Sequence, residues 1–186
     1  MSTQRLVIGG VVVASVSLTG WIVAREGNES MPYRDRGGTW TVCAGVTGPQ
    51  VVPGRPYSAE ECEALNAGAI ERHGRQVIEC LQGAPIAQHQ YDALASLAYN
   101  VGAHSVCASC LPGRLCLGDL ARAGRWPEAC ERILAYSKVR INGELQDCRD
   151  PRWGCRGVWL RRKAEADLCA GTPPAPAIPS SLGVMG

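Results

Sequence analysis

The chain begins with a long uncharged segment. Residues 6–24 contain no Asp, Glu, Lys or Arg, and Arg5 carries the single side-chain charge before them. A helix of that length would measure about 28 Å, close to the roughly 30 Å hydrocarbon core of a bilayer. Glycine, serine and threonine dilute its valine and leucine, so membrane insertion is expected to be only weakly favourable. We therefore predict that residues 1–24 form an apolar N-terminal helix and a weakly held membrane anchor.

After the anchor, the pattern changes from short β-like runs to helical periodicity. Thr, Val and Trp in residues 33–52 predict a small antiparallel sheet. Ser58 followed by Glu61 has the spacing of a capping box, which predicts a helix over 59–80. In residues 88–99 apolar positions recur at helical spacing and predict a helix of the core.

The second half of the chain continues with shorter elements. Helices are expected near 114–123 and 126–137, and a final helix over 157–169. Between them, Asn142 and Gly143 predict a turn that leads into a polar loop. The predicted fold class is therefore α+β and mostly helical, with one small antiparallel sheet near the start.

The predicted domain organisation is simple. Prolines between 172 and 179 exclude a helix, so residues 171–186 are expected to form a disordered tail. Residues 25–170 contain no internal repeat and are long enough for one domain with its own core. A net charge of +2 is too small to argue for a nucleic-acid partner, and none is expected. The mild basic excess favours an anionic polymer such as a cell wall.

Ten cysteines, all between residues 43 and 169, indicate an oxidising compartment and up to five disulfides. Zinc binding or redox chemistry is the alternative use, because Cys107 and Cys110 form a CxxC motif. No second CxxC or His pair follows at finger spacing, so disulfides are preferred and no metal or cofactor is expected. The disulfide candidates are Cys43, Cys62, Cys80, Cys107, Cys110, Cys116, Cys130, Cys148, Cys155 and Cys169.

Two acids and a hydroxyl follow the anchor. Glu26, Asp35 and Thr41 are spaced nine and then six residues apart. A glycosidic bond is cleaved by one carboxyl group that protonates the leaving oxygen and a second that acts on the opposite face of the sugar. A hydroxyl beside the second acid would help to hold the attacking water. Spacing alone favours a surface loop that contains two acids, and the rest of the chain is needed to support a catalytic role.

Several motifs in this order resemble the phage-type lysozymes, the muramidases of glycoside hydrolase family twenty-four. They cover roughly residues 25–169, nearly the whole globular part. The matching runs are Glu26-Gly27, Tyr33-Arg34-Asp35, Trp40-Thr41, Gln90-Tyr91-Asp92-Ala93-Leu94, Tyr99-Asn100-Val101-Gly102, and Gly157 with Arg161-Arg162 and Glu165.

The resemblance implies a fold and a set of roles. The fold would be phage-lysozyme-like, with the sheet in an N-terminal lobe and helices in a C-terminal lobe. Glu26 would be the general acid, Asp35 would orient or activate water, and Thr41 would sit beside that water. The bond cleaved would be the β-1,4 link between N-acetylmuramic acid and N-acetylglucosamine, with inversion. Binding or supporting positions would be Arg161, Asn100 and Gly45, with Arg161 near the catalytic glutamate or, alternatively, an ordinary surface charge.

The chain also departs from the family pattern. After the threonine it has Cys43-Ala44-Gly45-Val46-Thr47-Gly48 in place of a Gly-Tyr-Gly-His-Thr-like run. His73, His89 and His104 match no catalytic position and are expected to be surface or capping residues. The resemblance also implies disulfides that pair Cys43 with Cys62, Cys80 with Cys107, Cys130 with Cys169, and Cys148 with Cys155, leaving Cys110 and Cys116 for each other.

Some relatives carry a signal-anchor-release segment, and residues 6–24 are similar to one. The expected location is the host inner membrane, crossed once with the catalytic domain in the periplasm, followed by release to the periplasm. The expected partners are peptidoglycan and that membrane, and a monomer suffices. Ala24 also fits a signal-peptidase site, but cleavage there would leave Glu26 at a frayed terminus. A lytic transglycosylase and a catalytically silent wall-binding protein remain as alternative functions.

Overall fold

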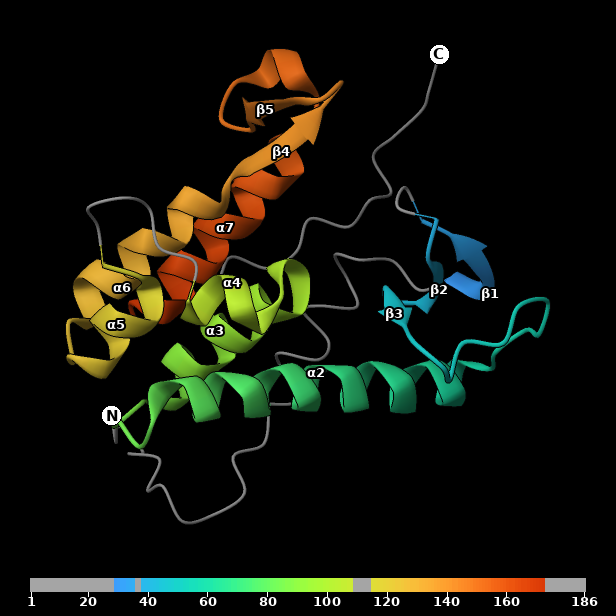
Figure 1. The fold of residues 1–186 in the computed structure, drawn as a ribbon, viewed down its shortest axis with the longest axis horizontal. Coiled ribbons are helices and arrows are strands. Elements are labelled where there is room, and N and C mark those ends of the chain that lie inside the picture. Colours follow the sequence, from blue (N-terminus) through green and yellow to red (C-terminus); the bar gives the residue numbers. More distant parts are fainter. Residues whose placement is uncertain (1–28, 36–37, 109–114, 173–186) are drawn as a thin grey trace.

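A computed structural model describes residues 29–35, 38–108 and 115–172 of the chain. A long helix, α2 (Ala59–Leu81), runs along one side of the molecule. A small sheet lies over the first part of α2, and the remaining helices pack over its second part (Figure 1). The molecule therefore has two lobes that share α2, as expected for a mostly helical α+β fold with an N-terminal sheet.

The sheet has three antiparallel strands in the order β1-β2-β3. They are β1 (Glu29–Arg34), β2 (Trp40–Cys43) and β3 (Val46–Thr47). Strand β1 starts four residues earlier than the Thr/Val pattern predicts, and a register shift interrupts its pairing with β2. Buried side chains of β2 and β3 pack on the first turns of α2 and form a core of their own. This core comprises Val42, Cys43, Val46, Val51, Tyr57, Cys62 and Ala69.

Helix α2 confirms the predicted capping box. The Glu61 N–H donates to the Ser58 hydroxyl, and the Ser58 N–H donates to the Glu61 carboxylate. The helix ends where Gln82 adopts a left-handed conformation with φ 52°. Its buried face continues from the sheet core into a second, larger core, so α2 contributes to both lobes.

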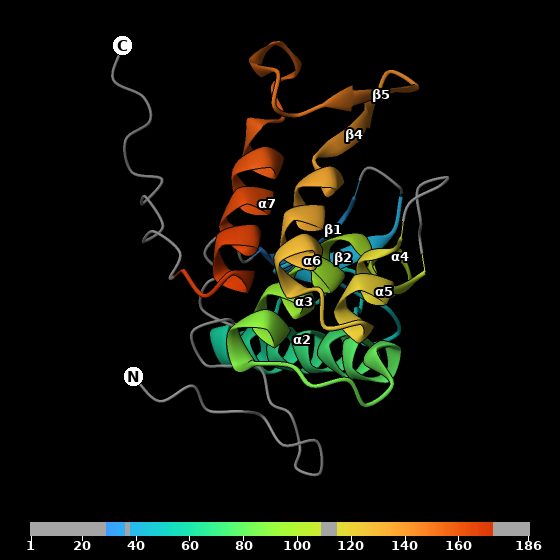
Figure 2. The ribbon, with the colours of Figure 1, turned by 90° about the vertical axis from the view of Figure 1, so that its left-hand side faces the viewer.

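The larger core belongs to the helical lobe. Helix α3 (Gln88–Val101) lies between α2 and α7 (Arg156–Cys169), and every residue from Tyr91 to Ala98 is buried (Figure 2). Gly102 ends α3 as a C-cap. The remaining elements of this lobe are α4 (Ala103–Cys107), α5 (Leu117–Arg122), α6 (Trp126–Arg132) and the 3-10 turn η1 (Ile133–Tyr136). Each helix predicted from the periodicity is therefore present, with boundaries shifted by a few residues.

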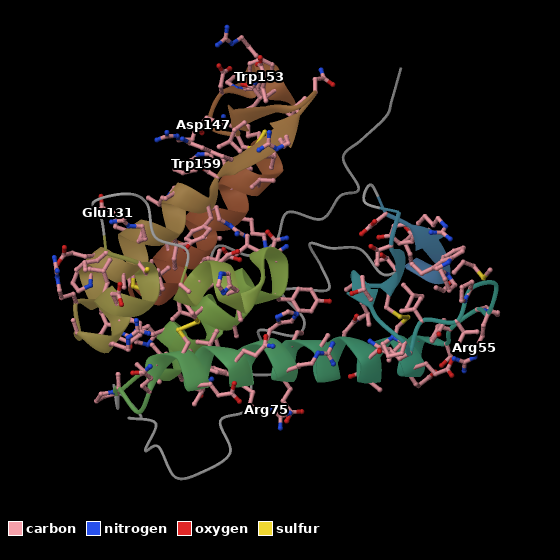
Figure 3. All side chains as sticks on the ribbon, viewed as in Figure 1. Arg55, Arg75, Glu131, Asp147, Trp153 and Trp159 are labelled. Carbon is pink, nitrogen blue, oxygen red and sulfur yellow. A yellow bond between two sulfur atoms is a disulfide. The ribbon has the colours of Figure 1, made fainter. Side chains whose placement is uncertain are left out.

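The prediction of a single sheet and a polar loop before residue 151 was wrong. Strands β4 (Lys138–Ile141) and β5 (Glu144–Asp147) form a second antiparallel hairpin. A 3-10 turn, η2 (Pro151–Trp153), follows it, and this hairpin arm projects beyond the helices (Figure 3). Asn142 and Gly143 have φ angles of 52° and 88°, as the primed turns of two-residue hairpins require. The strands were missed because each is only four residues long and Glu144–Asp147 contains a single apolar side chain.

Four of the expected disulfides are present: Cys43–Cys62, Cys80–Cys107, Cys130–Cys169 and Cys148–Cys155. Cys116 is also disulfide-bonded, and its expected partner, Cys110, lies outside the described residues. A bridge of this kind stabilises a domain by about 2–4 kcal/mol, largely by restricting the unfolded chain.

The predicted apolar helix over residues 6–24 and nearly all of the predicted tail lie outside the described residues. Within the described part of the chain, none of the helices combines the length and apolar character needed to cross a bilayer.

Candidate active site

The hairpin formed by β1 and β2 carries two of the three predicted catalytic residues. Asp35 directly follows β1, and its backbone N–H donates to the Thr39 carbonyl over 3.0 Å. In return, the Thr39 N–H donates to Oδ1 of the Asp35 carboxylate over 2.9 Å. The carboxylate is therefore held in a defined orientation at the entrance to β2.

Thr41 is buried in the same hairpin, with 4% of its surface exposed. Its hydroxyl donates to the Thr39 carbonyl over 3.2 Å, so one oxygen accepts both this hydroxyl and the Asp35 N–H. Asp35 and Thr39, which flank the turn between β1 and β2, exchange these hydrogen bonds with each other. Asp35 and Thr41 are thus linked through Thr39, to which both are hydrogen-bonded. A carboxylate and a hydroxyl in this relation can together hold a water molecule.

Arg34 stabilises this hairpin through contacts with Trp40 and Gly38. The Arg34 guanidinium lies 4.7 Å above the ring of Trp40, its cross-strand partner. The same guanidinium donates from Nη1 to the Gly38 carbonyl over 2.5 Å. An exposed cation–π contact contributes about 0.5–1 kcal/mol, which here favours the turn that presents Asp35.

A buried ionic cluster occupies the interface of α3 and α7. The Glu165 carboxylate is fully buried and accepts the Ser96 hydroxyl over 2.6 Å. Arg161 Nε and Arg162 Nη2 each donate to the same oxygen, Oε1, over 3.2 Å. Arg162 Nε lies 2.9 Å from Oε2, and Arg162 Nη2 also donates to Asn100 Oδ1 over 3.1 Å. Among the described residues, the cluster therefore sets two cations against one anion.

Burial shifts the pKa of each charged group in this cluster. It raises the pKa of Glu165, against the opposing effect of the two arginines. It lowers the pKa of Arg162 to about 10 and that of Arg161 below its ordinary value. The mutual pairing of these charges therefore offsets only part of the cost of removing them from water.

The predicted site residues fall into distinct places. The structure brings Asp35 and Thr41 together on the β1–β2 hairpin, and it brings Arg161 and Asn100 together in the ionic cluster. The surface-charge alternative for Arg161 is wrong, because only 8% of the residue is exposed. Gly45 belongs to neither group and lies in the turn between β2 and β3 with φ 91°. Glu26 lies outside the described residues.

Sequence reasoning missed several residues that hold these groups. Glu165 follows the two arginines by four and three residues, the spacing of helical ion pairs, so this partnership was detectable. Thr39 and Ser96 gave no such signal. His73, expected at the surface or at a cap, instead packs edgewise on Tyr99 with ring centroids 5.6 Å apart, and burial lowers its pKa.

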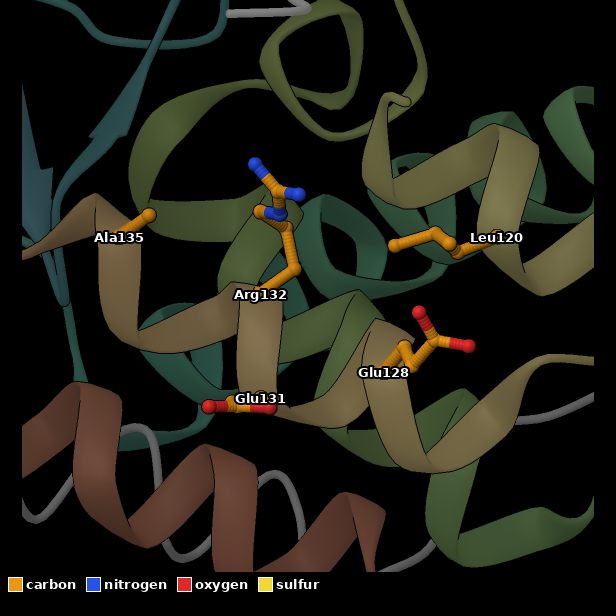
Figure 4. A pocket seen from close by; sticks show the side chains of 5 residues that line it. All are labelled: Leu120, Glu128, Glu131, Arg132 and Ala135. Atoms are coloured by element: carbon orange, nitrogen blue, oxygen red, sulfur yellow. The ribbon is translucent and has the colours of Figure 1, made fainter. Parts of the chain in front are cut away.

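A separate pocket lies on the helical lobe. It has a volume of about 250 Å³ and is lined by Leu120, Glu128, Glu131, Arg132 and Ala135 (Figure 4). It contains none of the predicted site residues. Among the residues that the structure describes, no three His, Cys, Asp or Glu side chains are grouped so that they could hold a metal ion.

The fold agrees with comparisons to known proteins. An endolysin of Escherichia coli O157:H7 phage FAHEc1 superposes with a TM-score of 0.72, covering 89% of this chain and 99% of its own, at 24% identity. The SAR-endolysin of Enterobacteria phage P21 is 31% identical over 87% of this chain and 88% of its own length. A probable prophage lysozyme of Escherichia coli (strain K12) is 35% identical over 87% of each.

The fold is thus that of a phage lysozyme, with an acid and a hydroxyl on its N-terminal hairpin. The profile described as phage lysozyme matches residues 23–165, and the chain belongs to this family.

Proposed function

We propose that this protein is an endolysin that lyses its bacterial host by hydrolysing the β-1,4 bond between N-acetylmuramic acid and N-acetylglucosamine in peptidoglycan. Family membership supports the class of enzyme, a lysozyme. The observation that carries the mechanism is the arrangement on the β1–β2 hairpin. There the main chain of Thr39 is hydrogen-bonded to both the Asp35 carboxylate and the Thr41 hydroxyl.

In the proposed reaction, Glu26 protonates the glycosidic oxygen. Asp35, in its ionised form, orients a water that Thr41 also contacts, and the water attacks the anomeric carbon from the opposite face. This geometry inverts the anomeric configuration and requires carboxyl groups about 6.5–9.5 Å apart, so that the water fits between the Asp35 carboxylate and the sugar. The orientation of Asp35 by the Thr39 N–H supports its role in holding the water.

The general acid must be protonated near neutral pH. An adjacent arginine lowers the pKa of a carboxyl group, whereas removal from water raises it. If Arg161 approaches Glu26, as in the family pattern, desolvation of Glu26 must outweigh the cation. Pairing with Glu165 helps, since it offsets part of the positive charge of Arg161.

Clearing of permeabilised Gram-negative cells, combined with analysis of the released muropeptides, tests the proposal. Wild-type protein should clear the cells and leave reducing muramic ends. Glu26→Gln and Asp35→Asn should each reduce the rate about 100-fold or more, the usual contribution of an acid or base. Glu63→Gln, which changes an exposed acid on α2, is the control and should retain full activity.

The muropeptide ends separate the alternatives. Anhydro ends would indicate a lytic transglycosylase, which needs one acid and no water. Intact murein after treatment with wild-type protein would leave only a wall-binding role. Substantial clearing by Glu26→Gln would refute the assignment of the acid.

The location of the enzyme is a second part of the proposal. Several relatives are named SAR-endolysins, and residues 6–24 have the weakly apolar composition of a releasable anchor. We expect a tethered form with its catalytic domain in the periplasm, which becomes active when the anchor leaves the membrane. Cell fractionation during membrane depolarisation should show transfer to the soluble fraction before lysis. Lysis by protein that stays fully membrane-bound would contradict this.

A further inference from the structure

The turn between β2 and β3, residues 43–45, is attached to the helices at three points. Cys43 forms a disulfide with Cys62 of α2. The Ala44 N–H donates to Oδ1 of Asn66, also on α2, over 3.1 Å. The Ala44 carbonyl accepts the Tyr99 hydroxyl of α3 over 2.6 Å. Three side chains from two helices therefore determine where this turn lies.

The attachment of Ala44 is specific. Ala44 is completely buried, so both of its main-chain polar groups need partners within the protein. Both partners come from side chains of the helices rather than from a neighbouring strand. The preceding residue, Cys43, has φ 55°, a conformation that non-glycine residues rarely adopt unless their surroundings impose it. The turn is thus held by the helices and not by its own conformational preference.

Tyr99 links the two lobes. Its ring packs against the core of the sheet lobe and against the core of the helical lobe. The edgewise contact with His73 fixes the ring from the side of α2. Burial raises the pKa of Tyr99 to about 12, so the hydroxyl remains a donor at any pH at which the enzyme works.

The residues that Tyr99 connects belong to the proposed site. On the sheet side, Ala44 follows Thr41 by three residues, and Thr41 is tied through Thr39 to Asp35. On the helical side, Tyr99 lies between Ser96 and Asn100, the residues of α3 that contact the ionic cluster. The end of α3 thus touches both the turn that follows β2, the strand of Thr41, and the cluster that contains Arg161.

We propose that Asn66 and Tyr99 are positioning residues that set the placement of Asp35 and Thr41 relative to the helical lobe. Neither would contact substrate. They would act through the turn at residues 43–45, which begins at the last residue of β2. The inference rests on the proposed function, because it assigns these residues to the same hydrolytic site. Misplacement of a reacting group by about 1 Å can lower a rate by up to 100-fold, so a small displacement of the turn should be measurable.

The test compares two tyrosines. Tyr99→Phe removes the bond to Ala44, and Tyr136→Phe removes an equivalent bond to the Ser105 carbonyl, made over 2.8 Å within the helical lobe. Both variants lose one half-buried hydroxyl and should lose similar thermal stability. On soluble murein fragments, Tyr99→Phe should lower kcat about tenfold with KM within twofold of wild type. Tyr136→Phe should change kcat by less than twofold.

Asn66→Ala provides a second measurement, and decides the question if Tyr99→Phe does not fold. It removes the other bond to Ala44 and should lower kcat in the same way, again with KM nearly unchanged. Equal kcat values for Tyr99→Phe and Tyr136→Phe, or a loss in Asn66→Ala that appears only in KM, would overturn the inference while the wild-type activity upholds the proposed function. Inactive wild-type protein would overturn both.

Discussion

Two guanidinium groups, those of Arg161 and Arg162, are removed from water at the interface of α3 and α7. Both contact the Glu165 carboxylate, which also accepts a hydrogen bond from the Ser96 hydroxyl. Glu165 therefore affects three properties at once: the charge balance of the cluster, the packing of α3 on α7, and the environment of Arg161. An exposed ion pair of the same helix, such as Lys163 with Asp167, contributes much less to stability.

We predict that Glu165→Gln destabilises the protein strongly. The variant removes the carboxylate that pairs with both buried guanidinium groups, and breaking a buried ion pair in this way typically costs about 3–5 kcal/mol. Asp167→Asn is the matched control, since Asp167 pairs with Lys163 over 3.2 Å on the exposed side of α7. It should cost less than about 1 kcal/mol. Urea unfolding at pH 7 measures both, and similar losses would contradict a special role for the buried carboxylate.

At the level of elements, close approach of α2 and α3 depends on a missing side chain. A Cβ at Gly74 of α2 would lie 2.0 Å from the Tyr91 hydroxyl oxygen and 2.8 Å from its Cζ. Tyr91 is fully buried, and among the described residues its hydroxyl has no hydrogen-bond partner. The two helices therefore pack at a distance that only glycine permits at this point.

Gly74→Ala should destabilise the protein by about 1–3 kcal/mol, the usual cost of overpacking a core. Gly68→Ala is the control on the same helix, where an added Cβ meets nothing within 4 Å. It should be neutral or stabilising by up to about 1 kcal/mol, because alanine favours helix. Tyr91→Phe should relieve part of the cost of Gly74→Ala. Additive effects in a double-mutant cycle by thermal unfolding would contradict the proposed contact.

The hairpin arm is held by different interactions. Arg149 contacts Asp147 through its side chain and its backbone N–H, and these bonds lower the pKa of Asp147 to about 2. An aspartate in an unfolded chain titrates near 3.9. Because the folded pKa is the lower one, the contribution of Asp147 to stability is fully present above about pH 4. It is lost as the pH falls toward 2.

We therefore expect acid to loosen the arm between pH 4 and 2. The protection factors of the β4 and β5 amides, which correct for the pH dependence of intrinsic exchange, should fall over this range in the wild type. Asp147→Asn should remove much of that pH dependence, whereas Glu144→Gln, at the exposed turn end of β5, should retain it. Exchange in β4 and β5 that is equally pH-dependent in Asp147→Asn and wild type would argue against this ion pair as the cause.

At the scale of the whole molecule, two hydrophobic cores share α2 and α3, and the proposed site is divided between the lobes. The sheet lobe holds Asp35 and Thr41, and the helical lobe holds the cluster of Arg161 and Glu165. The sheet core is the smaller of the two. A small core buries little apolar surface and depends on cross-links.

Replacing Cys43 and Cys62 by serine should loosen the sheet lobe selectively. The disulfide closes a loop with a sequence separation of 19 residues, which corresponds to about 3 kcal/mol in the chain-entropy description. Amide exchange should rise most in β1 to β3 and least in α3. The Cys148–Cys155 disulfide belongs to neither core, so replacing these two cysteines by serine should affect only the hairpin arm. Uniform loosening of both lobes by the first variant would count against separate cores.

Much of this molecule could be predicted from the sequence alone. The capping box at Ser58 and the periodicity of α3 are local patterns, because caps and helical faces depend on residues close in sequence. The anchor over residues 6–24 stays a prediction. The order of the motifs predicted the family and assigned roles to Asp35 and Thr41. The even cysteine count predicted disulfides, and the family pattern correctly indicated four pairings.

Only the tertiary structure decided which residues distant in sequence bond to the ionic cluster and to the β2–β3 turn. Ser96 bonds to Glu165 across 69 residues of sequence, and Tyr99 bonds to Ala44 across 55. Neither pairing leaves a periodic trace, because it depends on how α3 packs against α7 and against the sheet. The hairpin arm was missed because strands of four residues gain most of their stability from each other. Capping residues and hydrophobic periodicity determine where a helix begins and which face it buries. Which other element it packs against depends on the burial of apolar surface and on hydrogen bonds between residues distant in sequence.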